Sequence, residues 1–338
     1  MHLVIWVTSA CNLACKYCYE GDEKTNQMMD RSTADRILNY IDENAEENEE
    51  IRMVFHGGEP LLNFNLIKYF VEKISGKFER TKYQLTTNGT IMNGEIAQFL
   101  LDNFHSGISL SIDGKEDTHN SNRIYTDGRG SYGAVIKNIG TYFSRDQYNK
   151  FVIRMTLTSR NVSELFDNCM HLINMGFSTV ITALDQYDKG WNSEKFKELQ
   201  GQVYQIYQEA KKNNYEEKGI YLSLLDWKNR VKGECKISPK ILKVYVNGDV
   251  YPCVASAGDR SLILGNIFAD PFANMDLIEK LCKINKTRNL GCDNCKHKPY
   301  CVNSRCKLLN KAYNGDFLKP SEVECAYQNM IVNLQNLI

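Results

Sequence analysis

The sequence predicts an α/β fold, in which a partial (β/α)6 TIM-like barrel is followed by a small cysteine-rich C-terminal domain. In the first part of the chain, six short runs of β-branched and aromatic residues alternate with segments of helical period. In the last part, cysteines accumulate and the hydrophobic periodicity is weak. Because strands that alternate with helices pair in parallel, the six repeats imply a parallel sheet.

The strands and helices of the first domain, 1–184, follow from local patterns. The predicted strands are 2–8, 51–56, 82–87, 107–112, 151–157 and 178–184. Two helices are indicated by apolar residues that recur on one helical face, namely Ala34, Ile37, Leu38 and Ile41, and then Leu66, Ile67, Phe70, Val71 and Ile74. We expect the loops that follow the strands to lie together at one edge of the sheet.

Two further regions complete the predicted organisation. Residues 185–230 form a bridging helical segment, with a charged helix over 193–213 and the polar run KKNNYEEKG. Residues 231–338 form the cysteine-rich domain, in which 242–246 is a strand that enters a hairpin turn at 247–249. We expect this domain to need metal for its stability.

Composition excludes several classes of function. The 41 basic and 41 acidic residues give a formal net charge of zero, so neither nucleic acid nor an anionic membrane is an expected partner. There is no apolar stretch of membrane-spanning length and no export signal, which predicts a cytoplasmic protein. Reduced thiols in that compartment tend to bind metal or act in catalysis, and the chain has 12 cysteines. Cys169 shares a helical face with Leu165 and Leu172, so we expect it to be a packing residue.

The first strand leads into a C-x3-C-x2-C array, formed by Cys11, Cys15 and Cys18 with Tyr17 before the third cysteine. Three thiolates leave one iron of a four-iron cubane cluster free to bind another ligand. A structural zinc site would instead require a closed set of four ligands. The array therefore favours a reactive iron–sulfur cluster.

Polar or glycine-rich loops follow the next three strands. They contain Gly57, Gly58 and Glu59 of a GGEP sequence, then Thr87, Asn88 and Gly89, then Ser111, Asp113 and Gly114. Glycines let a backbone approach a ligand closely. Ser and Asp at a strand end also form turns or caps, and Arg123 in the next loop is also compatible with a solvated surface position.

Together, the C-x3-C-x2-C array, GGEP and the SLSIDG segment resemble the radical S-adenosylmethionine (radical SAM) superfamily. The resemblance implies a 4Fe–4S cluster on Cys11, Cys15 and Cys18, and S-adenosylmethionine bound at the open iron. It implies that the GGEP segment binds the amino group of the methionine moiety. The cofactor-binding residues predicted on this basis are Tyr17, Gly57, Gly58, Glu59, Asn88, Ser111, Asp113 and Arg123. The implied chemistry is reductive cleavage to a 5′-deoxyadenosyl radical that abstracts a hydrogen atom from the substrate.

The later cysteines resemble the SPASM extension of radical SAM enzymes, which binds auxiliary iron–sulfur clusters. The spacing before Cys306 is x4 where the family has x3. The resemblance implies one 4Fe–4S cluster on Cys292, Cys295, Cys301 and Cys325, and a second on Cys235, Cys253 and Cys306. The second set is completed by Cys282, or it leaves an iron open. Zinc at the C-x2-C pair is the alternative.

Members of this group mostly modify peptides, and we predict a peptide maturase that forms thioether crosslinks. Its sulfatase-maturing members carry an aspartate directly after the second SPASM cysteine, where this chain has Val254. Asp249 or Asp259 would have to replace that base. The alternatives are residue oxidation of the sulfatase-maturase type, carbon–carbon crosslinking, and dehydrogenation of a small molecule. A non-catalytic electron-transfer protein would not need the GGEP and SIDG loops.

The expected partners are a precursor peptide and an external electron donor of the flavodoxin or ferredoxin type. Many peptide maturases begin with a winged-helix domain of about eighty residues that binds the leader peptide. This chain begins with the strand that leads into the cysteine array. We therefore expect leader binding by a separate protein, by the 185–230 segment or by the loop 115–130.

Overall fold

The computed structural model describes residues 1–18, 20, 25–105, 107–226, 237–295, 297, 301 and 306–335. Its centre is one sheet with the strand order β10-β9-β8-β1-β2-β3-β4-β5-β6-β7. Six parallel strands form the barrel, namely β1 (His2–Thr8), β2 (Ile51–Gly57), β3 (Thr81–Thr87), β4 (Ile108–Ser111), β5 (Phe151–Leu157) and β6 (Thr179–Leu184). The predicted α/β class and the six predicted strands are confirmed.

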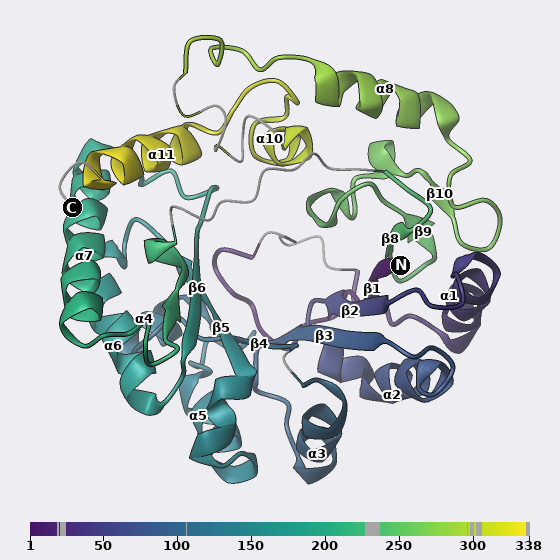
Figure 1. Cartoon of the computed structure of the whole chain (residues 1–338), viewed down its shortest axis with the longest axis horizontal. Helices are drawn as coiled ribbons and strands as arrows, with labels where there is room; N and C mark the ends of the chain where they lie inside the picture. The colour runs from purple at the N-terminus through teal and green to yellow at the C-terminus, as the bar shows by residue number, and fades with distance from the viewer. Residues whose placement is uncertain are drawn as a thin grey trace.

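Helices follow the strands and lie along the outside of the curved sheet (Figure 1). They are α1 (Arg31–Asn44), α2 (Phe64–Ile74), α3 (Gly94–Asn103), α4 (Glu116–Asn122), α5 (Tyr132–Tyr142), α6 (Leu165–Met175) and α7 (Ser193–Lys212). Short 3-10 turns lie at Pro60–Asn63, Arg145–Lys150 and Val162–Glu164. Side chains that accept backbone N–H groups begin several helices; Asp30 accepts from Thr33 at α1, and Asn93 from Ile96 at α3.

The core lies between the sheet and these helices. Alternate residues of each strand face it, as the buried Phe151, Ile153 and Met155 of β5 show. The apolar residues predicted for α1 and α2 are buried there. Cys169 of α6 is also fully buried, and its burial raises the pKa of the thiol to about 12, so its predicted packing role is confirmed. The residues on the opposite face of each strand point toward the barrel interior.

The described part of the predicted bridging segment, residues 185–226, is integrated into the barrel. Helix α7 was predicted over 193–213, and its Phe196, Leu199, Val203 and Ile206 are buried, with α6 and the C-terminal helix α11 (Glu322–Gln335) packed against it. It is followed by the edge strand β7 (Tyr221–Leu222) and a turn at Ser223–Leu225. The chain here forms the last helix and the last strand of the sheet.

The cysteine-rich region returns to the first strand. Strand β8 (Ile241–Val244) pairs in parallel with β1, from His2 opposite Ile241 to Ile5 opposite Val244. It continues through the turn at Gly248 (φ +88°) into β9 (Asp249–Val250) and β10 (Gly265–Asn266), which confirms the predicted hairpin. Short 3-10 turns lie at Val254–Ser256 and Arg260–Leu262.

Helices α8 (Met275–Lys286) and α10 (Lys307–Asn314) follow, and with α11 they lie on the opposite side of the barrel mouth from α2 and α3 (Figure 1). Within the described residues, no helix has the length and apolar character needed to span a bilayer.

Candidate active site at the barrel rim

The loop after β1 carries the first cysteine array. Cys11, Cys15 and Cys18 are partly buried thiols. The loop is held by the chain segment that follows α4, since the Ala14 N–H donates to the Ile124 carbonyl (2.7 Å) and the Lys16 N–H to the Asn122 carbonyl (3.0 Å). These backbone hydrogen bonds therefore help to fix the shape of the loop.

Gly57 and Gly58 bring the end of β2 against this loop. A Cβ at Gly57, whose φ is +139°, would lie 2.0 Å from the Thr8 carbonyl oxygen. A Cβ at Gly58 would lie 2.5 Å from the Ala10 carbonyl oxygen and 2.9 Å from the Cys11 Cβ. Such distances are too short for any side chain, so both positions require glycine for close packing of two backbones. These glycines thereby position Cys11.

The Glu59 carboxylate joins the second and third strand ends. It is fully buried, and it accepts the Asn88 N–H (2.7 Å), the Leu61 N–H (3.1 Å) and the Thr87 hydroxyl (2.8 Å). Burial raises its pKa to about 7, against the three donors, which lower it. In the described structure, Glu59 thus links the ends of β2 and β3. Together with the ends of β1 and β4 and the loops that follow these strands, they form the edge of the barrel called the rim.

Asp113, Tyr17 and Arg123 meet in a second buried group. The Asp113 carboxylate accepts the Tyr17 hydroxyl, an Arg123 guanidinium N–H (3.1 Å) and the Thr156 backbone N–H (2.9 Å). The guanidinium lies over the Tyr17 ring, 5.2 Å from its centroid. Burial lowers the pKa of Arg123, but Asp113, Tyr17 and nearby Cys15 outweigh this and raise it. The loop that carries Cys11, Cys15 and Cys18, called the cluster loop, is therefore connected to the end of β4.

His119 forms hydrogen bonds with residues that contact Arg123. It is fully buried, its Nδ1 accepts the Asp113 N–H (3.4 Å), and its Nε2 lies 2.9 Å from the Ser131 hydroxyl. The Ser131 hydroxyl donates to the Arg123 carbonyl (2.8 Å). An acceptor Nδ1 requires the neutral imidazole, and burial lowers the pKa of His119 to about 4.

The remaining predicted rim residues lie at the ends of β3 and β4. Asn88 is 7% exposed, and its side-chain amide reaches the Cys11 sulfur. Ser111 is the last residue of β4 and is buried. All eight predicted cofactor-binding positions thus lie on or directly beside the loops after β1 to β4, as the parallel topology requires.

Four later cysteines lie close together. Burial and the neighbouring thiols of Cys301, Cys292 and Cys295 raise the pKa of Cys325 to about 11. Cys301 is buried, while Cys325 projects from α11. These are the four cysteines that the resemblance to the SPASM extension assigns to one ligand set.

The other set is described in part. Cys253 and Cys306 directly precede the turn Val254–Ser256 and helix α10, and these two elements pack against each other. Cys282 is exposed on α8. Cys235 lies outside the described residues. In the part of the chain that the structure describes, no three histidine, cysteine or acidic side chains converge on one metal ion. A cubane does not require this, because each thiolate binds a different iron.

Comparison with known proteins assigns the family. A family model described as the radical SAM superfamily matches residues 5–172. An uncharacterized protein of Methanocaldococcus jannaschii is 30% identical over 276 residues, which cover 79% of this chain and 88% of that protein. The chain belongs to the radical SAM superfamily.

Other relatives of this radical SAM chain have assigned names. It is 25% identical to the AdoMet-dependent heme synthase of Methanosarcina barkeri over 96% of both chains. It is also 25% identical to the sporulation killing factor maturation protein SkfB of Bacillus subtilis, over 85% of this chain and 67% of that one.

Two solved structures share the fold of the radical SAM chain. The structure of anSMEcpe with bound AdoMet superposes with a TM-score of 0.80 at 19% identity, covering 99% of this chain and 94% of that one. Streptococcus suis SuiB bound to its precursor peptide SuiA has a TM-score of 0.65 at 16% identity, over 96% of this chain and 75% of that one. Because these matches cover nearly the whole chain, the fold extends through the cysteine-rich region.

The superfamily implies a 4Fe–4S cluster and S-adenosylmethionine, and the rim fits both. The thiols of Cys11, Cys15 and Cys18 lie on one loop and provide the donor set for three irons. Arg123 is 7% exposed, and its Nε is buried without a hydrogen-bond partner in the described structure. A buried donor of this kind is costly unless a ligand satisfies it. A carboxylate, such as that of the methionine moiety, would do so.

Sequence reasoning missed Asn12 at this radical SAM site, and it placed Thr87 and His119 in the loops of the site without predicting their contacts. Asn12 bridges Asn88 and Thr90, Thr87 donates to Glu59, and His119 orients the Asp113 region. Asn12 had a signal, because a polar residue directly follows the first cysteine of the array. The contact of His119 depends on how residues 114–130 fold back, and the contact of Thr87 depends on the pairing of β2 with β3, neither of which local patterns show.

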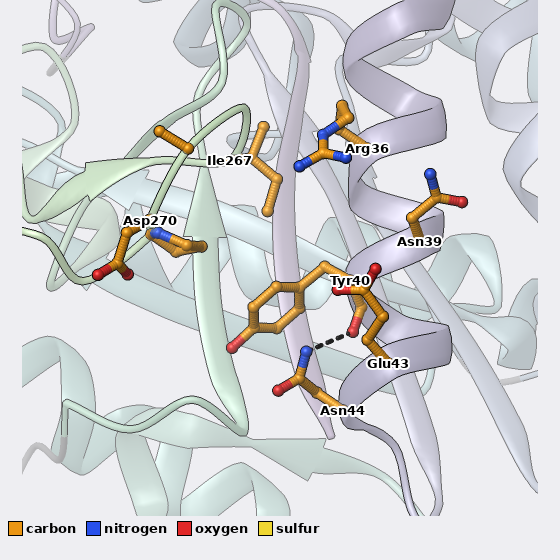
Figure 2. Close-up of a pocket in the computed structure, with 9 residues that line it drawn as sticks. Arg36, Asn39, Tyr40, Glu43, Asn44, Ile267 and Asp270 are labelled. Carbon is orange, nitrogen blue, oxygen red and sulfur yellow. Dashed lines mark hydrogen bonds between the residues drawn. The ribbon is translucent and has the colours of Figure 1, made fainter.

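Other groups near the radical SAM site do not join the rim. The Asp259 carboxylate accepts from Ser261 and caps a 3-10 turn, while Asp249 pairs with Asn247 and Asn266 in the hairpin. A cavity of about 210 Å³ lies between α1 and the 267–271 loop, lined by Arg36, Tyr40, Glu43 and Asp270 among others (Figure 2). It contains none of the predicted site residues.

Proposed function

We propose that this radical SAM enzyme is a peptide maturase. The observation that carries the proposal is the grouping of Cys292, Cys295 and Cys301 around Cys325 in a region that adjoins the barrel. A second set of thiols of this kind is suited to auxiliary clusters that accept an electron from a substrate. Two comparisons support a peptide substrate, since one relative is named a maturation protein and SuiB was solved with a precursor peptide.

In this proposal the rim residues have distinct tasks. The cluster is held by Cys11, Cys15 and Cys18. The Arg123 Nε donates to the methionine carboxylate, and Ser111 lies at the same rim. When bound, the cluster and S-adenosylmethionine supply a 5′-deoxyadenosyl radical. The chain's own residues orient the ligand and exclude water, because Glu59, Asp113 and Arg123 are buried.

The bond that we propose is a thioether. Its formation removes a hydrogen atom from a substrate carbon, a proton from a substrate thiol, and one electron that passes to an acceptor held by the later cysteines. Oxidation of the sulfatase-maturase type would need a base next to Cys253, where Val254 stands. Asp249 and Asp259 both accept hydrogen bonds in local turns, which supports the thioether over residue oxidation.

Two partners belong to the same proposal. An external donor of the flavodoxin or ferredoxin type would reduce the rim cluster. A separate leader-binding protein would recruit the precursor, or the 185–230 segment or the loop 115–130 would do so itself.

Iron analysis and product analysis test the proposal. The reconstituted protein should hold about twelve irons for three cubanes, against about four for one cubane with zinc. With dithionite and S-adenosylmethionine it should form 5′-deoxyadenosine. A cysteine-containing precursor should lose two hydrogens and one alkylatable thiol. An aldehyde at the cysteine would instead indicate residue oxidation, and absence of 5′-deoxyadenosine at every reduction level would exclude radical chemistry.

A small-molecule carboxylate is a second candidate substrate. The heme synthase relative matches 96% of both chains. Arg154 lies on the inner face of β5, opposite the buried residues, and within the described structure it has no ion-pair partner. Its Nε donates only to the Ser109 hydroxyl (3.4 Å). Turnover of a carboxylate-bearing heme precursor, lost in Arg154→Leu, would favour this candidate over the peptide.

A further inference from the structure

The orientation of the Asn88 side chain is fixed by its neighbour. Its Oδ1 accepts the Thr90 backbone N–H (3.0 Å) and the Thr90 hydroxyl (2.7 Å). Because a backbone N–H can only donate, the oxygen of the amide must face Thr90. The amide nitrogen must therefore face the other way, toward the cluster loop.

On that side the nitrogen has two acceptors. It lies 2.9 Å from the Asn12 Oδ1 and 3.9 Å from the Cys11 sulfur. Asn12 is held in turn, since its Nδ2 donates to the Thr90 hydroxyl (2.7 Å). The contact with Cys11 thus belongs to a closed network of three polar side chains.

The network is anchored in the barrel on both sides. The Asn88 N–H donates to Glu59, and Asn138 of α5 donates to the carbonyls of Gly89 and Thr90, both at 3.0 Å. The close contact at Gly58 fixes Cys11 from the other side. Neither the amide nor the sulfur can move far, so the contact is preorganised.

A donor held against a cysteine sulfur affects a cluster bound to it. Hydrogen bonds to the sulfurs and solvent exposure set the reduction potentials of iron–sulfur clusters. Reduction adds negative charge, which a donor stabilises, and it does so more strongly at a site shielded from water. Asn88 is 7% exposed, and the Leu13 N–H approaches the same sulfur (3.4 Å).

We propose that Asn88 is a positioning residue that donates to the Cys11 sulfur and thereby raises the reduction potential of the rim cluster. The proposal rests on the proposed function, because it requires a cluster on Cys11, Cys15 and Cys18. It adds a role in tuning the electron transfer that precedes S-adenosylmethionine cleavage. In this role Asn88 acts through Cys11, without touching the substrate.

The test is the reduction potential of the cluster whose EPR signal changes when S-adenosylmethionine is added. Asn88→Leu should lower the ratio of reduced to oxidised cluster about threefold at a fixed solution potential, as expected for one modest hydrogen bond. Asn88→Asp keeps the oxygen that accepts from Thr90 and adds negative charge, so its decrease should be larger. Asn93→Leu, in the same loop but at the α3 cap, should leave the potential unchanged.

The outcomes separate this proposal from the proposed function. A wild-type protein without a signal that responds to S-adenosylmethionine would contradict the proposed function. A normal signal with an unchanged potential in Asn88→Leu would overturn the role of Asn88 alone, as would a shift seen only in Asn88→Asp. Should both variants fail to load a cluster, wild-type protein with ¹⁵N-labelled asparagine decides. Its reduced cluster should show coupling to a side-chain nitrogen, and no coupling would overturn the inference.

Discussion

His119 illustrates how one buried side chain stabilises the rim in a single protonation state. Its Nδ1 accepts the Asp113 N–H, and its Nε2 faces Ser131. Protonation would place a second donor against the Asp113 N–H and would put a positive charge beside Arg123. Burial and the charge of Arg123 lower the pKa of His119 to about 4, which agrees with a hydrogen-bond network that requires the neutral ring.

This network predicts a pH dependence of stability. The folded-state pKa of His119 lies below its unfolded value of about 6.5, so its contribution is present above pH 6.5 and is lost as the pH falls toward 4. The free energy of unfolding of the wild type should exceed that of His119→Gln by an amount that shrinks over this range. Urea unfolding at pH 7 and pH 4.5 measures it. His105→Gln, at an exposed site, is the control. A difference that does not vary with pH would contradict the neutral-ring network.

The backbones at the ends of β1 and β2 are in close contact because Gly57 and Gly58 have no side chains. The loops after these two strands therefore form one structural unit. Gly58 should therefore tolerate no side chain. Gly58→Ala should lower the free energy of unfolding by about 1–3 kcal/mol, as for overpacking, and should reduce iron loading at the rim. Thermal unfolding and the iron content measure both effects.

The matched control lies in α5. Gly133 is a helical glycine with open space around it, so Gly133→Ala should be neutral or should stabilise by up to about 1 kcal/mol. Equal effects of the two substitutions would show that the contact at Gly58 is unimportant.

Local sequence patterns predicted the barrel well, for physical reasons. Strands 2–8 and 151–157 have the predicted bounds because a continuous run of buried residues marks the first, alternating buried residues mark the second, and polar loops follow both. The pairing of β8 with β1 was not predictable, since the two strands lie far apart in the sequence and no local pattern marks a partner. Similarly, sequence placed Asp113 and Arg123 on the rim, but their ion pair depends on the fold of the loop between them.

The whole molecule is built around one continuous sheet. Because β8 extends that sheet beside β1, the cysteine-rich region shares backbone hydrogen bonds with the strand that leads into the cluster loop. Lys240 strengthens this connection, with its ammonium bonded to Glu49 (2.7 Å) and to the Asn44 carbonyl (2.8 Å). We expect the barrel and the hairpin to unfold together.

Hydrogen exchange tests this expectation. Leu242 and Val244 of β8 are fully buried, as are Leu3 and Ile5 of β1, so amides of the two strands should exchange with similar opening free energies. The two-residue edge strand β7 should exchange faster. Exchange in β8 that is orders of magnitude faster than in β1 would show that the hairpin unfolds as a separate unit.

The pairing of β8 with β1 also bears on how the protein can be handled. If the chain were cut after α7, β1 would become an edge strand with a row of unpaired N–H and C=O groups. Strands of this kind recruit other chains, and β1 is almost entirely apolar, so the shortened protein should aggregate. The two cysteine groups are therefore best separated by single substitutions at their thiols, which leave every strand of the sheet in place.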